Sequence, residues 1–272
     1  ASAEFSDRHF VSTMQSAKGR PAVYPIVTDE DWIVKNTNQR RKLILFDMDG
    51  TLIDIGYAHR KAVLMTVKAI YGKELRDGLA PHQYQGETQP NIMRAIGQML
   101  GVPTETVEAR LPEAMRMQAE ATVAMLENDL RKAILPGVEP LLEALQDMGH
   151  LLGLVTGTIS AIASVALQRT GLWRFFPLCA CGEEGAERLD LLHLAIDRAA
   201  RTYCWQETGN GLVVVGDAVR DIKAGMALGA RVVAVATGVH RLADLAQHGP
   251  HAILPSLDDL DAALDAILAR SG

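Results

Sequence analysis

The chain has 272 residues, of which 48% are hydrophobic and 22% are charged, and its formal net charge is −6. This composition is typical of a globular protein that buries a sizeable core, so it excludes a chain that is disordered throughout. The negative net charge gives no electrostatic reason to expect a nucleic acid or an anionic membrane as a partner.

The first feature with chemical meaning is a short apolar run that ends in two acids. Residues 1–41 are polar and irregular, and we treat them as an N-terminal extension of unknown role. The run from Leu43 to Phe46 follows, and then Asp47 and Asp49 stand directly before a Gly-Thr turn. So short an apolar run is typical of a buried strand in a parallel sheet. Ligands of such sheets bind beyond the carboxyl ends of the strands, where these two acids stand.

The spacing of Asp47 and Asp49 suits a site that binds a cation. Residues i and i+2 of an extended chain point to the same side, so both carboxylates can reach one ligand. Two carboxylates at such a short separation repel each other unless a cation lies between them. Mg²⁺ is a suitable cation because it prefers oxygen ligands. One acid can then act as a nucleophile and the other as an acid and base. The alternative is an ordinary pair of acidic loop residues.

The next segment, residues 58–133, is predicted to be helical. Its apolar residues recur at helical spacing, and several glycines and prolines divide it into separate helices. Because it interrupts the strand pattern after the first strand, we expect residues 58–133 to form a helical cap domain over the strand ends, placed to act as a lid.

From residue 134 onward, strands and helices alternate. This pattern predicts an α/β fold with a Rossmann-like, three-layer core and a mostly parallel sheet, formed by residues 42–57 and 134–272. The expected strands are 151–155, 178–181, 212–215 and 232–235, and the expected helices are 138–148, 159–170, 189–201 and 220–228.

Two further strand ends carry polar residues. Thr156, Gly157 and Thr158 follow one strand, where hydroxyl and backbone N–H groups can hold a phosphate oxygen, although Thr158 can instead cap the next helix. Asp217 and Asp221 follow another strand at the start of a helix. They are candidate metal ligands, with a helix-dipole role for Asp221 as the alternative.

The order of these motifs resembles the haloacid dehalogenase superfamily of phosphohydrolases, in its phosphoglycolate-phosphatase-like branch. The motifs are D-x-D-G-T, an apolar strand followed by Thr-Gly, and G-D-x-x-x-D-I-x-A-G, and the resemblance covers about residues 42–270. It implies that Asp47 attacks phosphorus to form an aspartyl-phosphate. Asp49 would protonate the leaving alcohol and then activate water, and Thr156 would bind the phosphoryl group.

The resemblance also implies a metal site and a substrate site. Asp47, Asp49 through its carbonyl, and Asp217 would hold Mg²⁺, with Asp221 close behind or binding through water. The expected substrate-binding residues are Gly50, Thr51, Gly157, Thr158, Gly86 and Thr88. The last two belong to a Tyr-Gln-Gly-Glu-Thr segment that is similar to the family's cap loop, and their alternative is a structural role.

One position departs from the family pattern. The family usually has a Lys before the helix that precedes the last motif, but the segment 182–190 contains none. Arg188 is the candidate replacement, because a guanidinium is always charged and binds phosphate with two donors. An ordinary surface arginine is the alternative.

These observations favour a Mg²⁺-dependent phosphatase that acts on a small phosphorylated metabolite. The alternatives are a sugar phosphomutase of the same branch and a catalytically degenerate member that keeps the fold as a binding module. A phosphonate-cleaving relative is less favoured, because the loop from Gly86 to Arg94 offers no Lys for a Schiff base. The sequence specifies neither the substrate nor the oligomeric state.

The number of cysteines and the hydropathy of the chain indicate the cellular compartment in which we expect the protein. The chain has 3 cysteines without C-x-x-C spacing, which indicates neither a disulfide framework nor a zinc site. With no apolar run of membrane-spanning length and no segment typical of a secretion signal, we expect a cytoplasmic protein in a reducing compartment.

Overall fold

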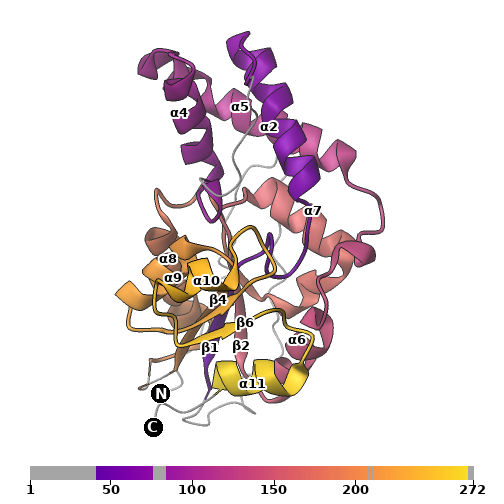
Figure 1. The fold of residues 1–272 in the computed structure, drawn as a ribbon, viewed down its shortest axis with the longest axis vertical. Helices are drawn as coiled ribbons and strands as arrows, with labels where there is room; N and C mark the ends of the chain where they lie inside the picture. The colour runs from indigo at the N-terminus through magenta and orange to yellow at the C-terminus, as the bar shows by residue number, and fades with distance from the viewer. Residues whose placement is uncertain (1–40, 76–83, 208, 210, 269–272) are drawn as a thin grey trace, which may run out of the picture.

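The computed structural model describes residues 41–75, 84–207, 209 and 211–268. The predicted extension therefore lies outside the described residues except for Arg41, and part of the predicted cap segment does too. Within the described residues, the centre of the molecule is one six-stranded sheet with the strand order β3-β2-β1-β4-β5-β6. Figure 1 shows this sheet in the lower half of the molecule. Its strands are β1 (Leu43–Phe46), β2 (Leu151–Val155), β3 (Leu178–Ala180), β4 (Leu212–Gly216), β5 (Arg231–Val235) and β6 (Ala252–Leu254).

Every pairing between these strands is parallel, so the predicted sheet is confirmed. Strand β1 lies between β2 and β4 and all of its residues are buried. Because all strands run the same way, the loops after β1, β2 and β4 meet at one edge.

Helices cover both faces of the sheet and complete the predicted three layers. Leu43 and Leu45 of β1 pack into a cluster with α8 and α9, whereas Ile44 and Phe46 pack on the other face with α6, α7 and α11. These helices are α6 (Val138–Asp147), α7 (Ser160–Thr170), α8 (Arg188–Tyr203), α9 (Val219–Ala227) and α11 (Leu260–Leu268); the short α10 (Leu242–Ala246) lies beside β6.

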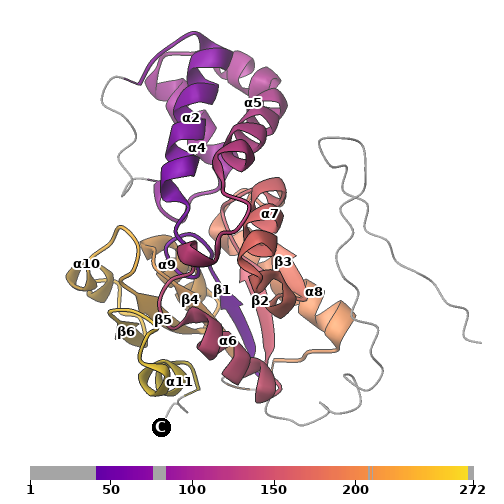
Figure 2. The same cartoon turned by 90° about the vertical axis from the view of Figure 1, so that its right-hand side faces the viewer.

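The helices between β1 and α6 form a separate unit above the carboxyl edge of the sheet (Figure 2). They are α2 (Gly56–Tyr71), α4 (Gln89–Met99) and α5 (Thr104–Met125), and they share an apolar cluster of their own around Val67, Met93 and Ile96. No helix in the described part of the chain is long and apolar enough to cross a membrane.

Candidate active site

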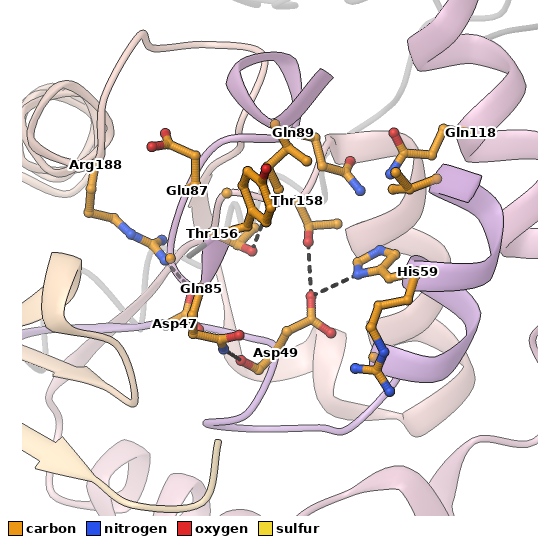
Figure 3. A pocket seen from close by; sticks show the side chains of 17 residues that line it. Asp47, Asp49, His59, Gln85, Glu87, Gln89, Gln118, Thr156, Thr158 and Arg188 are labelled. Atoms are coloured by element: carbon orange, nitrogen blue, oxygen red, sulfur yellow. Dashed lines mark hydrogen bonds and ion pairs between the residues drawn. The ribbon is translucent and has the colours of Figure 1, made fainter. Parts of the chain in front are cut away.

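A cavity of about 140 Å³ lies where the carboxyl edge of the sheet meets the helical unit (Figure 3). Its core side comes from the loops after β1 and β2 and from the start of α8. Its other side comes from α2, α4, α5 and the loop before α4. The lining residues that carry the predicted chemistry are Asp47, Asp49, Gly86, Thr156, Gly157, Thr158 and Arg188.

Three buried carboxylates form a cluster beside this cavity. Each of Asp47, Asp217 and Asp221 places one carboxylate oxygen within 4.8 Å of those of the other two. Asp47 follows β1, and the other two flank the junction of β4 and α9, so the order of adjacent strands brings them together. An all-oxygen donor set of this kind suits Mg²⁺.

The electrostatics of the cluster also fit a cation. Burial and the neighbouring carboxylates of Asp47 and Asp221 raise the pKa of Asp217 well above its ordinary value. Burial raises the pKa of Asp221 to about 7, although Arg188 acts against this shift. A divalent cation at these oxygens would favour the charged carboxylates and reverse both shifts.

Arg188, the predicted replacement for the family's Lys, is buried within this cluster. Its Nη2 donates to Asp47 Oδ1 at 2.7 Å and its Nη1 donates to the Val155 carbonyl at 2.8 Å. Its Nε lies 2.9 Å from Asp221 Oδ1 without hydrogen-bond alignment, so that contact is an ion pair only. Burial acts to lower the pKa of Arg188, but Asp221 and Asp47 more than offset this and raise it. The side chain therefore stays charged next to Asp47.

Asp49 points away from the carboxylate cluster and into the cavity. Its Oδ2 accepts a hydrogen bond from Thr158 Oγ1 at 2.9 Å and lies 3.4 Å from His59 Nδ1. Although 23% of the side chain is exposed, the atoms around it belong mostly to protein, and desolvation raises the pKa of Asp49. A raised pKa suits a carboxyl group that must give up and recover a proton.

Thr158 therefore contributes to the cavity rather than capping α7. The N-cap position of α7 is Ile159, and the N–H groups of Ile159 and Ser160 donate to the side chains of Gln89 and Glu183. Thr156 also lines the cavity, and its Oγ1 accepts a hydrogen bond from the Thr158 N–H at 3.1 Å. The hydroxyls of Thr156 and Thr158 thus lie on the same loop, with the second one next to Asp49.

The loop before α4 rests directly on the core. Gly86 has a left-handed φ of 72°, and a Cβ there would lie 2.8 Å from Ala218 Cβ. The N–H of Gln89 donates to the Gly157 carbonyl at 2.9 Å, and a Cβ on Gly157 would lie 2.0 Å from the Glu87 carbonyl. Both predicted glycines are therefore required where the loop approaches the core backbone closely.

Gln85 of the same loop reaches the predicted metal site. Its Nε2 donates to the Asp49 carbonyl at 3.2 Å and to Asp217 Oδ2 at 2.8 Å. Arg220 of α9 donates to the Gln85 carbonyl at 2.9 Å and forms an ion pair with Glu87. The Asp49 carbonyl thus faces the same point as Asp217, as the metal prediction requires.

Three predicted substrate-binding residues do not line the cavity formed by the described residues. Thr51 is fully buried, and its hydroxyl donates to Asp217 Oδ1 at 3.2 Å. Gly50 adopts a φ of 87°, and a Cβ there would lie 2.7 Å from Asp217 Oδ2. Thr88 is buried, with its N–H donating to Glu87. Their positions suit the support of Asp217 and of the loop, rather than direct contact with a ligand in the cavity.

Three glutamines also line the cavity: Gln85, Gln89 and Gln118. Sequence reasoning included Gln85 in the segment that is similar to the family's cap loop but gave it no role, and it missed the other two. A glutamine in a helix carries no spacing signal, so only the packing of the helical unit reveals Gln89 and Gln118. His59, which follows the first motif closely, also lines the cavity.

Comparisons with known proteins agree with this geometry. The family model described as haloacid dehalogenase-like hydrolase matches residues 41–229. A phosphoglycolate phosphatase of Xanthomonas campestris is 31% identical over 210 residues, which are 75% of this chain and 86% of that protein. The pyrophosphatase PpaX of Anoxybacillus flavithermus is 28% identical, covering 80% of this chain and 94% of that protein. The β-phosphoglucomutase structure of Clostridium difficile has a TM-score of 0.67 at 17% identity, over 83% of this chain and 96% of that one, which shows a common fold.

Proposed function

Because the chain belongs to the haloacid dehalogenase-like hydrolase family, we propose that this phosphatase uses Mg²⁺ and hydrolyses a small phosphomonoester through an aspartyl-phosphate. The observation that carries the proposal is the different setting of the two acids after β1. Asp47 lies against Arg188 and two further carboxylates, whereas Asp49 faces the cavity beside Thr158 and His59.

The proposed first step forms the covalent bond. A carboxylate oxygen of Asp47 attacks phosphorus, the bond from phosphorus to the ester oxygen breaks, and Asp49 gives its proton to the leaving alkoxide. In the second step Asp49 takes a proton from water, the water oxygen attacks phosphorus, and the bond to Asp47 breaks to release phosphate. Arg188 and Thr156 would hold the phosphoryl oxygens during both steps.

The oxygens of Asp47 and Asp217 and the carbonyl of Asp49 would hold Mg²⁺, with Asp221 beside them. The ion would neutralise negative charge on the transferring phosphoryl group. The raised pKa of Asp217, caused by burial and by adjacent carboxylates, supports this assignment because such a cluster calls for a cation.

We further propose that residues 58–133 act as the cap domain of this enzyme. The contacts of Gln85, Gly86 and Glu87 with the core support this proposal, because they hold a segment of the helical unit against the core at the cavity. Closure excludes water other than the attacking molecule and strengthens the interactions of charged groups inside.

The test is phosphate release from a panel of small phosphomonoesters, with and without Mg²⁺. We expect release to require Mg²⁺ and to be lost in Asp47→Asn, with the exposed Asp147→Asn as the matched control. Release that persists in Asp47→Asn would contradict the proposed nucleophile. Product analysis with glucose phosphates, which separates free phosphate from an isomerised sugar phosphate, would identify a mutase instead. No turnover of either kind would favour the degenerate binding module.

A further inference from the structure

The part of the cavity around Asp49, His59 and Gln118 contains buried polar atoms that have no hydrogen-bond partner among the described residues. They are Oδ1 of Asp49, Nε2 of His59, and both amide atoms of Gln118, Nε2 and Oε1. Gln118 lies on α5 and is only 1% exposed. A buried amide with neither end paired is rare in folded proteins and needs an explanation.

The position of these atoms in the cavity indicates which part of a substrate they can contact. Asp47 and Arg188 lie at one end of the cavity, His59 and Gln118 lie at the other end, and Asp49 lies between them (Figure 3). In the proposed reaction the phosphoryl group occupies the Asp47 end, and the leaving alcohol lies beyond Asp49. The unpaired atoms of Gln118 therefore belong to the part of the cavity that receives the alcohol.

The hydrogen-bonding groups of Gln118 indicate which functional group the leaving alcohol carries. Its carboxamide is uncharged and offers one acceptor and two donor hydrogens, so its best complement is a group that both donates and accepts. A hydroxyl group does both, whereas a carboxylate only accepts and would leave Oε1 facing a negative charge. Val63 and Ile92 line the cavity as well, and they suit the carbon atoms that bear the hydroxyl.

We propose that Gln118 is a specificity-determining residue that recognises a hydroxyl group on the leaving alcohol, so that the substrate is the phosphate ester of a small hydroxylated alcohol. The proposal rests on the proposed function. The cavity volume of about 140 Å³ suits an alcohol of a few carbon atoms.

The test compares esters that differ in their hydroxyl groups. Glycerol 3-phosphate and propyl phosphate have three carbons each, and phosphoglycolate replaces the hydroxyls with a carboxylate. We expect the unsubstituted protein to favour glycerol 3-phosphate over propyl phosphate in kcat/KM by at least tenfold. In Gln118→Leu, kcat/KM for glycerol 3-phosphate should fall about tenfold or more, whereas that for propyl phosphate should change less than about threefold.

Two further variants sharpen the test. Gln118→Glu keeps the side-chain shape but loses the amide donor, so it should also lose the preference for glycerol 3-phosphate. Gln98→Leu, an exposed change on α4, is the control and should keep it. As an independent measurement, Gln118→Leu should raise the thermal unfolding temperature in the absence of ligand, because it removes two unpaired buried atoms.

The outcomes separate this inference from the proposed function. An unchanged ratio of the two esters in Gln118→Leu, or a preference of the unsubstituted protein for phosphoglycolate, would overturn the role of Gln118 alone. Absence of phosphate release from all three esters by the unsubstituted protein, or release that survives Asp47→Asn, would overturn the proposed function and this inference with it.

Discussion

The guanidinium of Arg188 contacts three groups at once: the carboxylates of Asp47 and Asp221 and the carbonyl of Val155. A lysine in its place would carry the charge but has a single ammonium group, so it cannot keep all three contacts in this geometry. We expect Arg188→Lys to lower kcat/KM for phosphate release about tenfold and Arg188→Met to lower it by about 10²–10³-fold.

The exposed Arg174→Met is the matched control for loss of a positive charge. Equal rates in Arg188→Met and in the unsubstituted protein would show that the ion pair with Asp47 has no part in the reaction. Measurement of urea unfolding alongside the rates separates a catalytic loss from a loss of folded protein.

A second residue, His150, links folding stability to pH at the far end of the sheet from the cavity. It precedes β2, and its Nδ1 accepts a hydrogen bond from the Lys42 N–H at 3.3 Å. Burial, with help from Lys42 and Arg41, lowers the pKa of His150 from 6.5 to about 4. The unfolded chain therefore binds this proton first as the pH falls, so the contribution to stability is complete above pH 6.5 and is lost towards pH 4.

We expect His150→Asn to show a smaller loss of stability between pH 7 and pH 4.5, because asparagine keeps an acceptor but does not titrate. Since His150 is partly exposed and screened by solvent, the difference should be about 1 kcal/mol. Urea unfolding at several pH values measures this difference. The exposed His248→Asn should keep the acid-induced loss. Parallel pH curves for His150→Asn and the unsubstituted protein would contradict the role of His150.

At the scale of residues, the positions of the acidic side chains at the candidate site can be predicted from the sequence better than those of the amide side chains. Asp47, Asp217 and Asp221 follow apolar runs that end at a common edge, so the order of adjacent strands brings their carboxylates together, whereas Asp49 faces the cavity. The three glutamines of the cavity have no such marker. The position of Gln118 depends on how α5 packs against α2, which residue spacing does not specify.

At the scale of elements, residues 84–88 before α4 connect the helical unit to the proposed metal site. Gln85 donates to the Asp49 carbonyl and to Asp217, two of the groups proposed to bind Mg²⁺. The amide hydrogens thus compete with the ion for the same oxygens. We expect Gln85→Leu to bind Mg²⁺ about tenfold more tightly, since these hydrogen bonds no longer have to break.

Isothermal titration of Mg²⁺ into the two proteins measures the difference without any turnover. Gln98→Leu, on the exposed side of α4, is the control for replacing a glutamine in this unit. Weaker Mg²⁺ binding by Gln85→Leu would show that the Gln85 side chain assists the ion instead of competing with it.

Most of the core elements could be predicted because buried parallel strands form short apolar runs. Strand β6 (Ala252–Leu254) was missed: it has three residues at the edge of the sheet, and none of them is fully buried. Helices α10 and α11 at the end of the described chain were missed as well. Within the helical unit only the helical character was predictable, because the packing of α2, α4 and α5 depends on contacts between the helices.

At the scale of the whole molecule, we expect repulsion within the carboxylate cluster to lower the stability of the metal-free protein. Three buried acids lie close together, with Arg188 as the cation that pairs with two of them in the described residues. We expect Asp217→Asn to raise the unfolding temperature of the metal-free protein by a few degrees, because about 1 kcal/mol corresponds to about 2–4 °C in a domain of this size.

The same variant should lose the stabilisation by Mg²⁺, which in the unsubstituted protein reaches about 2.7 kcal/mol at a concentration 100 times Kd. Thermal unfolding with and without Mg²⁺ measures both effects, with the exposed Asp129→Asn as control. A lower unfolding temperature for metal-free Asp217→Asn would show that the Asp217 contacts outweigh the repulsion.

The strand order determines when the candidate site can assemble during translation. Asp47 emerges early, but its neighbours in space follow β2, β3 and β4, and Asp221 is the last of them to be synthesised. Strand β1 cannot acquire its second neighbour, β4, until most of the chain has left the exit tunnel. A nascent chain therefore contains Asp47, the proposed nucleophile, before it contains the groups that are proposed to activate it, and the site can form only when β4 joins the sheet.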